Sequence, residues 1–262
     1  MLIEVLKQEY LGDNNLFLSR LVDELHKLGA PITFKGSMII QYLTKNRPDR
    51  LLRRTIDTDC NWDINELSVT MQELTDYVKN AVANIDSDLV VEVSRNFDVV
   101  RNVSAGFTIH YRNSVIGKLD VSIRPDYFDD VYITYEGVKV RGAHLFKILV
   151  DKFSTVSTNK IFYRFKDLVD LYIIAYSSDE IFDTEDILLT ASLINRDIGD
   201  FSQFRNDKSH LESIYAKFKR LSGNQPNFNV FYNRLYEFFK PFFNGKKSVP
   251  YLVWHECKWH LS

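Results

Sequence analysis

The chain has 262 residues, of which 45% are hydrophobic and 26% charged, and its formal net charge is −2. This length is enough for one large domain or two small ones, and the apolar fraction excludes a globally disordered chain. The small net charge excludes nucleic-acid binding through bulk electrostatic attraction, so any such contact has to be local.

The cysteines and the N-terminal residues predict a cytoplasmic protein without a membrane partner. Cys60 and Cys257 are far apart in the sequence and make no disulfide framework, which favours a reducing compartment. The first ten residues carry Glu4, Lys7 and Glu9 where a signal peptide has an apolar run. No stretch reaches the roughly 18 uninterrupted apolar residues of a membrane helix.

The first elements lead to a turn that is suited to phosphate. Residues 16–28 have apolar side chains at helical spacing, and residues 32–35 form a short apolar segment typical of a strand. Gly36 and Ser37 then begin a turn, before a helix predicted over residues 38–43. Backbone N–H groups and a hydroxyl in such a turn can bind phosphate oxygens.

A basic run follows this turn. Five cations stand against the single acid Asp49: Lys45, Arg47, Arg50, Arg53 and Arg54. A solvated loop is the ordinary interpretation of such a run. Its position between the turn and the next acidic motif favours the alternative, a set of contacts to phosphate or RNA.

Two aspartates follow on a strand predicted over residues 55–62. Alternate side chains of a strand point to the same face, so Asp57 and Asp59 are expected to lie side by side. Two adjacent carboxylates repel each other unless a cation lies between them, and Mg²⁺ bound through oxygen suits this place. A solvated pair on a strand or loop is the alternative interpretation.

The rest of the chain divides near residue 141. Before it, a helix is predicted over residues 65–85 and strands over residues 89–94, 107–111, 115–123, 131–135 and 138–140. After it, helices are predicted over residues 143–153, 165–177, 181–195, 210–221 and 229–239. The sequence therefore predicts an α+β fold, with a mixed domain over residues 1–141 and an all-helical domain over residues 142–262.

A third carboxylate, Asp120, lies with Lys118 on the polar face of the strand predicted over residues 115–123. Alone it is best explained as a solvated residue. Together with Asp57 and Asp59 it could bind two metal ions and direct them at a transferring phosphoryl group. Asp120 would then help to deprotonate the attacking hydroxyl.

Five short blocks, in order, make the chain resemble the AbiEii/AbiGii toxin-like nucleotidyltransferases, within the DNA polymerase β-type superfamily. The blocks are Lys35-Gly36-Ser37, Arg54-Thr55-Ile56-Asp57-Thr58-Asp59, Lys118-Leu119-Asp120, Asp151-Lys152, and Arg164-Phe165-Lys166-Asp167-Leu168-Val169-Asp170-Leu171. The chain departs from the family in having Ser37-Met38, where the family often has a second Gly and a Thr. The gap between Ser37 and Asp57 is also long.

The resemblance implies a site built from both halves, with the helical half closing a cleft. The implied metal ligands and catalytic residues are Asp57, Asp59 and Asp120, with Mg²⁺ or Mn²⁺ as the cofactor. The implied nucleotide-binding residues are Gly36, Ser37, Lys118, Lys152, Lys166, Asp167 and Asp170. A surface salt bridge between Lys166 and Asp170 is the alternative explanation of that last pair.

The implied activity is transfer of a nucleoside monophosphate from a nucleoside triphosphate to an acceptor hydroxyl, with release of pyrophosphate. RNA such as a tRNA 3′ end is the favoured acceptor, and the implied role is the toxin of a toxin–antitoxin or abortive-infection system, with a cognate antitoxin as partner. Two alternatives stay open: a small-molecule or protein acceptor, and a non-catalytic binding protein on the same fold. The aromatic residues from 228 to 243 are predicted to be helix core, with a base-stacking platform as the alternative.

Overall fold

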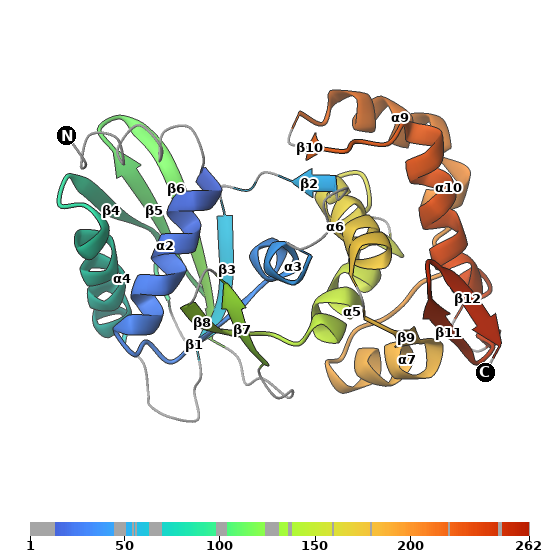
Figure 1. Cartoon of the computed structure of the whole chain (residues 1–262), viewed down its shortest axis with the longest axis horizontal. Helices are drawn as coiled ribbons and strands as arrows, with labels where there is room; N and C mark the ends of the chain where they lie inside the picture. Colours follow the sequence, from blue (N-terminus) through green and yellow to red (C-terminus); the bar gives the residue numbers. More distant parts are fainter. Residues whose placement is uncertain are drawn as a thin grey trace. The chain divides into compact units, whose positions relative to one another are not determined.

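The computed structural model describes residues 14–44, 51–53, 55, 57–62, 70–97, 104–123, 131–135, 138–158, 160–178, 180–219, 221–245 and 248–261 (Figure 1). The chain forms two compact units. The first comprises Met1–Tyr42 and Arg54–Ala143, and the second comprises Leu43–Arg53 and His144–Ser262. The second unit thus includes a segment that precedes residue 142 in the sequence.

The first unit is built on a mixed seven-stranded sheet with the order β4-β5-β6-β3-β1-β8-β7. Its strands are β1 (Ile32–Lys35), β3 (Asp57–Trp62), β4 (Leu89–Arg95), β5 (Ser104–Tyr111), β6 (Ser114–Ile123), β7 (Val131–Tyr135) and β8 (Val138–Gly142). The central strand β3 runs parallel to β6 and antiparallel to β1. This places the predicted carboxylate strands next to each other in the middle of the sheet.

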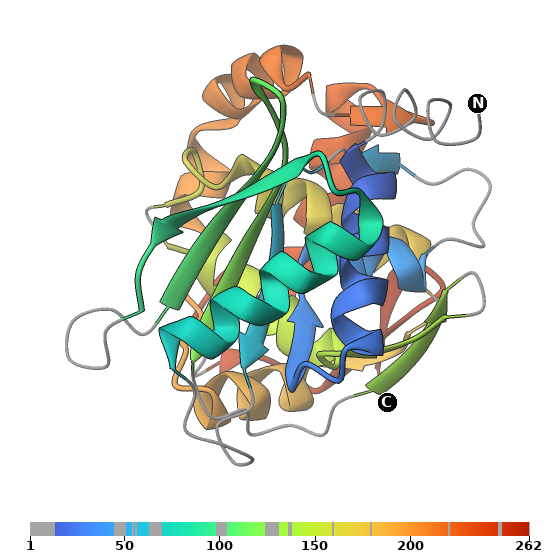
Figure 2. The ribbon, with the colours of Figure 1, turned by 90° about the vertical axis from the view of Figure 1, so that its left-hand side faces the viewer.

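Two helices, α2 (Asn14–Lys27) and α4 (Met71–Ile85), lie over one face of this sheet (Figure 2). Helix α4 begins where Thr70 and Glu73 form a reciprocal capping box, an arrangement that contributes about 1 kcal/mol. Helix α2 approaches β6 so closely that a Cβ atom on Gly117 would lie 2.6 Å from the Phe17 ring. The covered face is therefore apolar, and polar side chains of the strands are left for the other face.

The second unit is mainly helical. Its helices are α5 (Leu145–Val156), α6 (Phe165–Ser177), α7 (Thr184–Leu193), α8 (Ser202–Asn206), α9 (Lys208–Lys217), α10 (Phe228–Phe239) and the 3₁₀ turn η1 (Lys240–Phe242). Two small sheets accompany them: β2 (Leu51–Arg53) with β10 (Leu221–Gly223), and β9 (Phe182–Asp183) with β11 (Leu252–His255) and β12 (Lys258–Leu261). The predicted fold class, a mixed sheet flanked by helices and followed by a helical region, is confirmed.

Aromatic rings form the core of the second unit. Phe153 makes edge contacts with four other phenylalanines at centroid distances of 5.2–5.4 Å: Phe201, Phe238, Phe239 and Phe242. All five are fully buried. Each such pair contributes about 0.5–1.5 kcal/mol beyond area burial. The aromatic stretch of α10 and η1 is thus helix core, as its spacing predicted.

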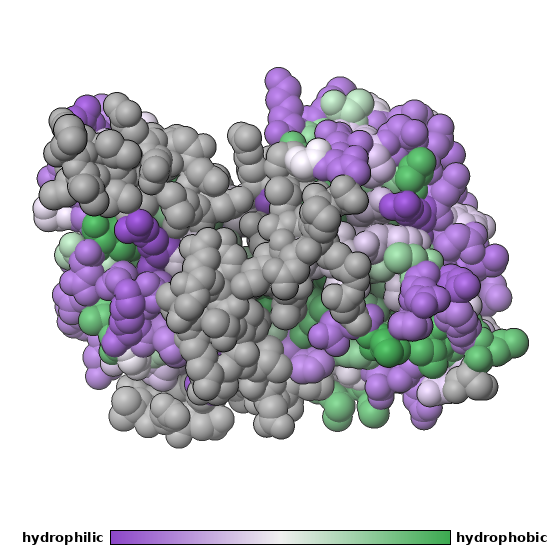
Figure 3. Space-filling view, in the orientation of Figure 1, coloured by the Kyte–Doolittle hydropathy of each residue, from purple (hydrophilic) through white to green (hydrophobic). Residues whose placement is uncertain are grey.

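Hydrophobic surface is also present on the second unit. Figure 3 shows it at the lower right of that view, in the region of α7 and the C-terminal strands. Exposed large apolar side chains in these segments include Leu189, Leu193 and Leu261. Within the part of the chain that the structure describes, no helix has the length and apolar character needed to cross a membrane.

Candidate active site

The strand register brings two of the predicted carboxylates side by side. In the parallel pair β3 and β6, Asp59 is the partner of Asp120, and Asp57 is the partner of Lys118. Partners in register on neighbouring strands present their side chains to the same face of a sheet. The alternating residue Thr58 is buried on the opposite face, whereas all three aspartates are partly exposed.

The Gly36-Ser37 turn lies against this pair. Strand β1 is antiparallel to β3, with Lys35 as the partner of Asp59. Gly36 follows in a left-handed conformation with φ of 74°, and a Cβ atom there would lie 3.1 Å from Oδ2 of Asp59. Glycine is needed for the conformation and for this close approach. The turn and Ser37, the first residue of α3 (Ser37–Leu43), are therefore next to the Asp59 carboxylate.

Asp57 is held by Thr55, to which the sequence assigned no role. The buried Thr55 hydroxyl donates a hydrogen bond to Oδ1 of Asp57 and accepts one from the Asp57 backbone N–H at 3.3 Å. These two bonds fix the orientation of the carboxylate at the start of β3. The threonine in the Arg-x-Thr-x-Asp-x-Asp block was the available signal for this contact.

Asp120 is paired with Arg95, which sequence reasoning missed. Nη2 of Arg95 donates to Oδ1 of Asp120 at 2.5 Å. Arg95 follows a register shift in β4 and reaches Asp120 across Gly106, its register partner on the intervening strand β5. A Cβ atom on Gly106 would lie 2.9 Å from Oγ of Ser94 and 3.4 Å from Oδ1 of Asp120. No local pattern in the sequence predicts a contact that depends on a strand irregularity and a missing side chain.

The donor set suits a hard divalent cation, because all its groups are carboxylate oxygens. However, no group of three or more His, Cys, Asp or Glu side chains that could hold a metal ion is found among the described residues. The predicted convergence of Asp57, Asp59 and Asp120 on a metal is therefore not seen. The carboxylates of Asp57 and Asp120 instead bond to Thr55 and Arg95. Metal binding stays a prediction that the chemistry of the donors fits.

A second predicted group of residues forms a buried ionic cluster within the second unit. Arg53 donates two hydrogen bonds to Asp170, from Nε to Oδ1 at 2.7 Å and from Nη2 to Oδ2 at 3.1 Å. Lys152 donates to Oδ2 of Asp170 at 2.7 Å and to Oδ1 of Asp167 at 3.1 Å. The exposed fraction is 1% for each aspartate and 2% for Arg53.

Mutual charge compensation sets the protonation states in this cluster. Burial by itself would raise the pKa of Asp170, but the charges of Lys152 and Arg53 outweigh burial and hold this pKa at about 2. Burial by itself would lower the pKa of Lys152, and the charges of Asp170 and Asp167 raise it above its ordinary value. Asp170 and Lys152 are therefore both charged at neutral pH.

The cluster changes the expected surroundings of several residues. Lys152 was expected to face nucleotide phosphates, yet its ammonium bonds two buried carboxylates. The alternative of a surface salt bridge at Asp170 is wrong, because Asp170 is buried. Arg53 was expected to contact phosphate or RNA, but its guanidinium is buried and bonds to Asp170. Lys166 is partly buried on α6.

The remaining predicted contacts can be placed only in part. Lys118 is exposed on β6, and its Cα is in register with that of Asp57. Arg47, Arg50 and Arg54 lie outside the described residues, so their predicted RNA or phosphate contacts stay predictions.

Comparison with known proteins relates the chain to others through its fold. No family model and no curated protein sequence matches it. The crystal structure of JHP933 from Helicobacter pylori matches with a TM-score of 0.52 and 19% identity, over 86% of this chain and 88% of that one. A second H. pylori protein, assigned provisionally as a nucleotidyltransferase, matches with a TM-score of 0.50 and 19% identity, over 84% and 89% of the two chains. The chain therefore shares its fold with these proteins, while membership of the AbiEii/AbiGii family is not confirmed.

Proposed function

We propose that this chain is a metal-dependent nucleotidyltransferase, which moves a nucleoside monophosphate from a nucleoside triphosphate to an acceptor hydroxyl and releases pyrophosphate. The observation that carries the proposal is the register of β3 and β6, which sets Asp59 beside Asp120 next to the Gly36-Ser37 turn. The fold shared with a provisionally assigned nucleotidyltransferase supports the same reaction class.

Each residue then has a specific task. Asp57 and Asp59, with Asp120, would hold Mg²⁺ or Mn²⁺, which when bound neutralises negative charge on the triphosphate. Thr55 fixes the orientation of the Asp57 carboxylate through its hydroxyl. Ser37 offers its hydroxyl to the phosphates.

Asp120 serves as the general base in this proposal. Its Oδ1 is fixed by Arg95, so Oδ2 is the oxygen that accepts the proton of the acceptor hydroxyl. Arg95 thus acts on the reaction through Asp120, as a positioning residue. The partly exposed position of Asp120 lets an acceptor hydroxyl reach this oxygen.

The acceptor and the biological role rest on the family resemblance. RNA such as a tRNA 3′ end is the acceptor we propose, in a cytoplasmic toxin that a cognate antitoxin restrains. A small molecule or a protein side chain is the second acceptor class. A non-catalytic binding protein on the same fold is the alternative from a different functional class.

The test combines labelling with matched variants. The protein is incubated with each of the four nucleoside triphosphates labelled at the α-phosphate, with Mg²⁺ or Mn²⁺, and with total RNA, protein or small-molecule acceptors. We expect labelled RNA with the wild type and at least a ~100-fold loss with Asp59→Asn or Asp120→Asn, since each removes a carboxylate that acts in the reaction.

Asp76→Asn is the control, because it makes the same substitution at an exposed position of α4. Labelling that survives both site variants would refute the mechanism. Triphosphate binding by calorimetry without transfer to any acceptor would favour the non-catalytic alternative.

A further inference from the structure

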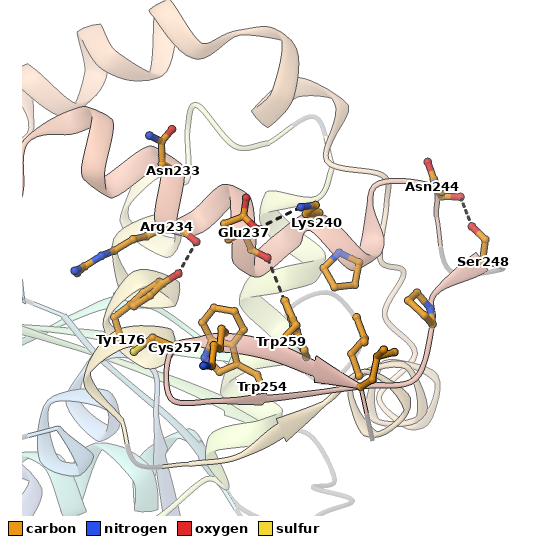
Figure 4. A pocket seen from close by; sticks show the side chains of 15 residues that line it. Tyr176, Asn233, Arg234, Glu237, Lys240, Asn244, Ser248, Trp254, Cys257 and Trp259 are labelled. Carbon is orange, nitrogen blue, oxygen red and sulfur yellow. Dashed lines mark hydrogen bonds and ion pairs between the residues drawn. The ribbon is translucent and has the colours of Figure 1, made fainter.

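A pocket of about 910 Å³ lies in the second unit, between α10 and the hairpin of β11 and β12 (Figure 4). Its described lining residues all belong to the second unit, and Tyr176 at the end of α6 contributes to one side. None of these lining residues takes part in the site proposed above. A pocket of this volume is large enough for a ligand of nucleotide size.

Three aromatic rings line the pocket, and their polar atoms are already bonded within the protein. Trp254 is buried, whereas Trp259 and Tyr176 are partly exposed. The ring N–H of Trp254 donates to the backbone carbonyl of Ala175 at 3.1 Å, and that of Trp259 donates to the carbonyl of Glu237 at 3.1 Å. The Tyr176 hydroxyl donates to the carbonyl of Arg234 at 2.7 Å. The partly exposed Trp259 therefore offers a ligand its ring surface rather than a hydrogen-bond donor.

The ring arrangement is rigid. Trp259 packs parallel to Phe238, with 9° between the ring planes, and meets the edge of Trp254 at a centroid distance of 5.2 Å. The turn of the hairpin between them has Glu256 and Cys257 in left-handed conformations, as a tight two-residue turn requires. A platform that is ordered before binding loses little entropy when a ligand stacks on it.

The charges that line the pocket are mainly positive. Among the described lining residues, Arg234, Lys240 and Lys258 are exposed, and Glu237, which lies 3.5 Å from Lys240, is the single acid. This local excess of positive charge contrasts with the formal net charge of −2 of the whole chain. The guanidinium of Arg234 lies over the Tyr176 ring, 5.1 Å from its centre, and donates to the Tyr172 hydroxyl at 2.6 Å, so this cation is held by the protein's own rings.

From this combination we infer that the pocket binds a nucleoside phosphate, with the base against the ring surface of Trp259 and the phosphate near Lys258. Stacking on aromatic side chains beside cations is how proteins bind single nucleotides in flexible strands without reading their sequence. The ligand can be a free nucleotide or one nucleotide of single-stranded RNA. This inference does not depend on the proposed transfer reaction.

The experiment separates binding from catalysis. The Asp57→Asn, Asp59→Asn double variant is titrated in EDTA with each nucleoside monophosphate and with unlabelled hexacytidylate, and tryptophan emission is recorded. We expect quenching with at least one of these probes. Trp259→Ala should weaken binding at least about fivefold, the loss expected for one stacked base, whereas Trp259→Phe should retain most of the affinity.

Charge variants test the phosphate contact. Lys258→Glu should weaken binding at least about fivefold and reduce its salt dependence, and Lys219→Glu, an exposed lysine outside the pocket, should leave binding unchanged. Equal affinity for the monophosphate and the hexanucleotide would identify a free nucleotide as the natural ligand. Much tighter binding of the hexanucleotide would identify single-stranded RNA as the natural ligand.

Two results would overturn the inference. The first is no binding of any probe, or binding that Trp259→Ala and Lys258→Glu leave unchanged in variants whose thermal unfolding matches the wild type. The second is binding of an acidic, tryptophan-containing hexapeptide in place of all nucleotides, which would indicate a protein partner. Either result leaves the labelling experiment untouched, so failure here is distinct from failure of the proposed reaction.

Discussion

Substitution of Asp170 by Asn tests the buried cluster, because it removes the carboxylate that bonds to both Arg53 and Lys152. Asp167, which already bonds to Arg164, would then be the carboxylate left for both Arg53 and Lys152. Removal of one partner from a buried ion pair leaves an uncompensated charge and costs about 3–5 kcal/mol. We expect the free energy of unfolding at pH 7 to fall by this amount, measured by denaturant titration.

A comparison of the destabilisation caused by two variants makes the test sharper. Lys152→Met removes a cation and leaves Asp167 and Asp170 with Arg53 and Arg164, so the charges still balance. It should therefore destabilise the protein less than Asp170→Asn. Asp151→Asn on the same helix is the control, because its pair with Arg196 is solvent-exposed and is expected to contribute less than about 1 kcal/mol. If Lys152→Met is the more damaging change, the charge argument is refuted.

The dependence of the free energy of unfolding on pH below pH 4 gives an independent measurement. The pKa of Asp170 is about 2 in the folded protein, against an ordinary value of 3.8. A lowered pKa stabilises the folded state above pH 3.8, and this stabilisation is lost as the pH falls toward 2. The difference corresponds to roughly 2 kcal/mol. In Asp170→Asn this contribution to acid unfolding should be absent, and an unchanged slope between pH 4 and 2 would contradict the assignment.

Two glycine substitutions test the first unit. Gly36→Ala should lower the free energy of unfolding by about 1–2 kcal/mol and reduce RNA labelling, because it strains the left-handed backbone and crowds Asp59. Gly29→Ala is the control, because Gly29 also has a positive φ but has open space around it. It should lower the free energy of unfolding by a similar amount and leave labelling intact. Gly117→Ala should lower the unfolding free energy by about 1–3 kcal/mol, because the new methyl would meet the Phe17 ring at 2.6 Å, and an unchanged denaturation midpoint would refute this close approach of α2 to the sheet.

The sequence was sufficient for the features that depend on local periodicity. The alternation around Asp57 and Asp59 predicted a strand with both carboxylates on one face. The structure has this strand and buries the intervening Thr58 on the other face. It could not give the order of strands. That Asp59 has Asp120 as its register partner follows from a parallel pairing across more than fifty intervening residues, which no local pattern encodes.

Residue type was a poor guide wherever charge balance decided the environment. In the sequence, Arg53 belongs to a basic run that is typical of a solvated or phosphate-facing loop. In the structure it is buried in β2, with its guanidinium bonded to an aspartate 117 positions away. The free energy of burying a guanidinium depends on whether a carboxylate meets it, and that partner is fixed by tertiary contacts rather than by neighbours in the run.

The buried cluster also bears on how the motif in α6 should be understood. Asp167 and Asp170 are three positions apart on a helix, so they share one side, and both use that side to bind the ammonium of Lys152 from α5. Asp170 also bonds to Arg53 of β2, so one set of charges joins three segments of the second unit. The Asp-x-x-Asp spacing of Asp167 and Asp170 is thus explained by this structural requirement, without a nucleotide. A site role for these two aspartates therefore needs evidence beyond the motif, whereas Asp57, Asp59 and Asp120 owe their place on the polar face of the sheet to the register of their strands.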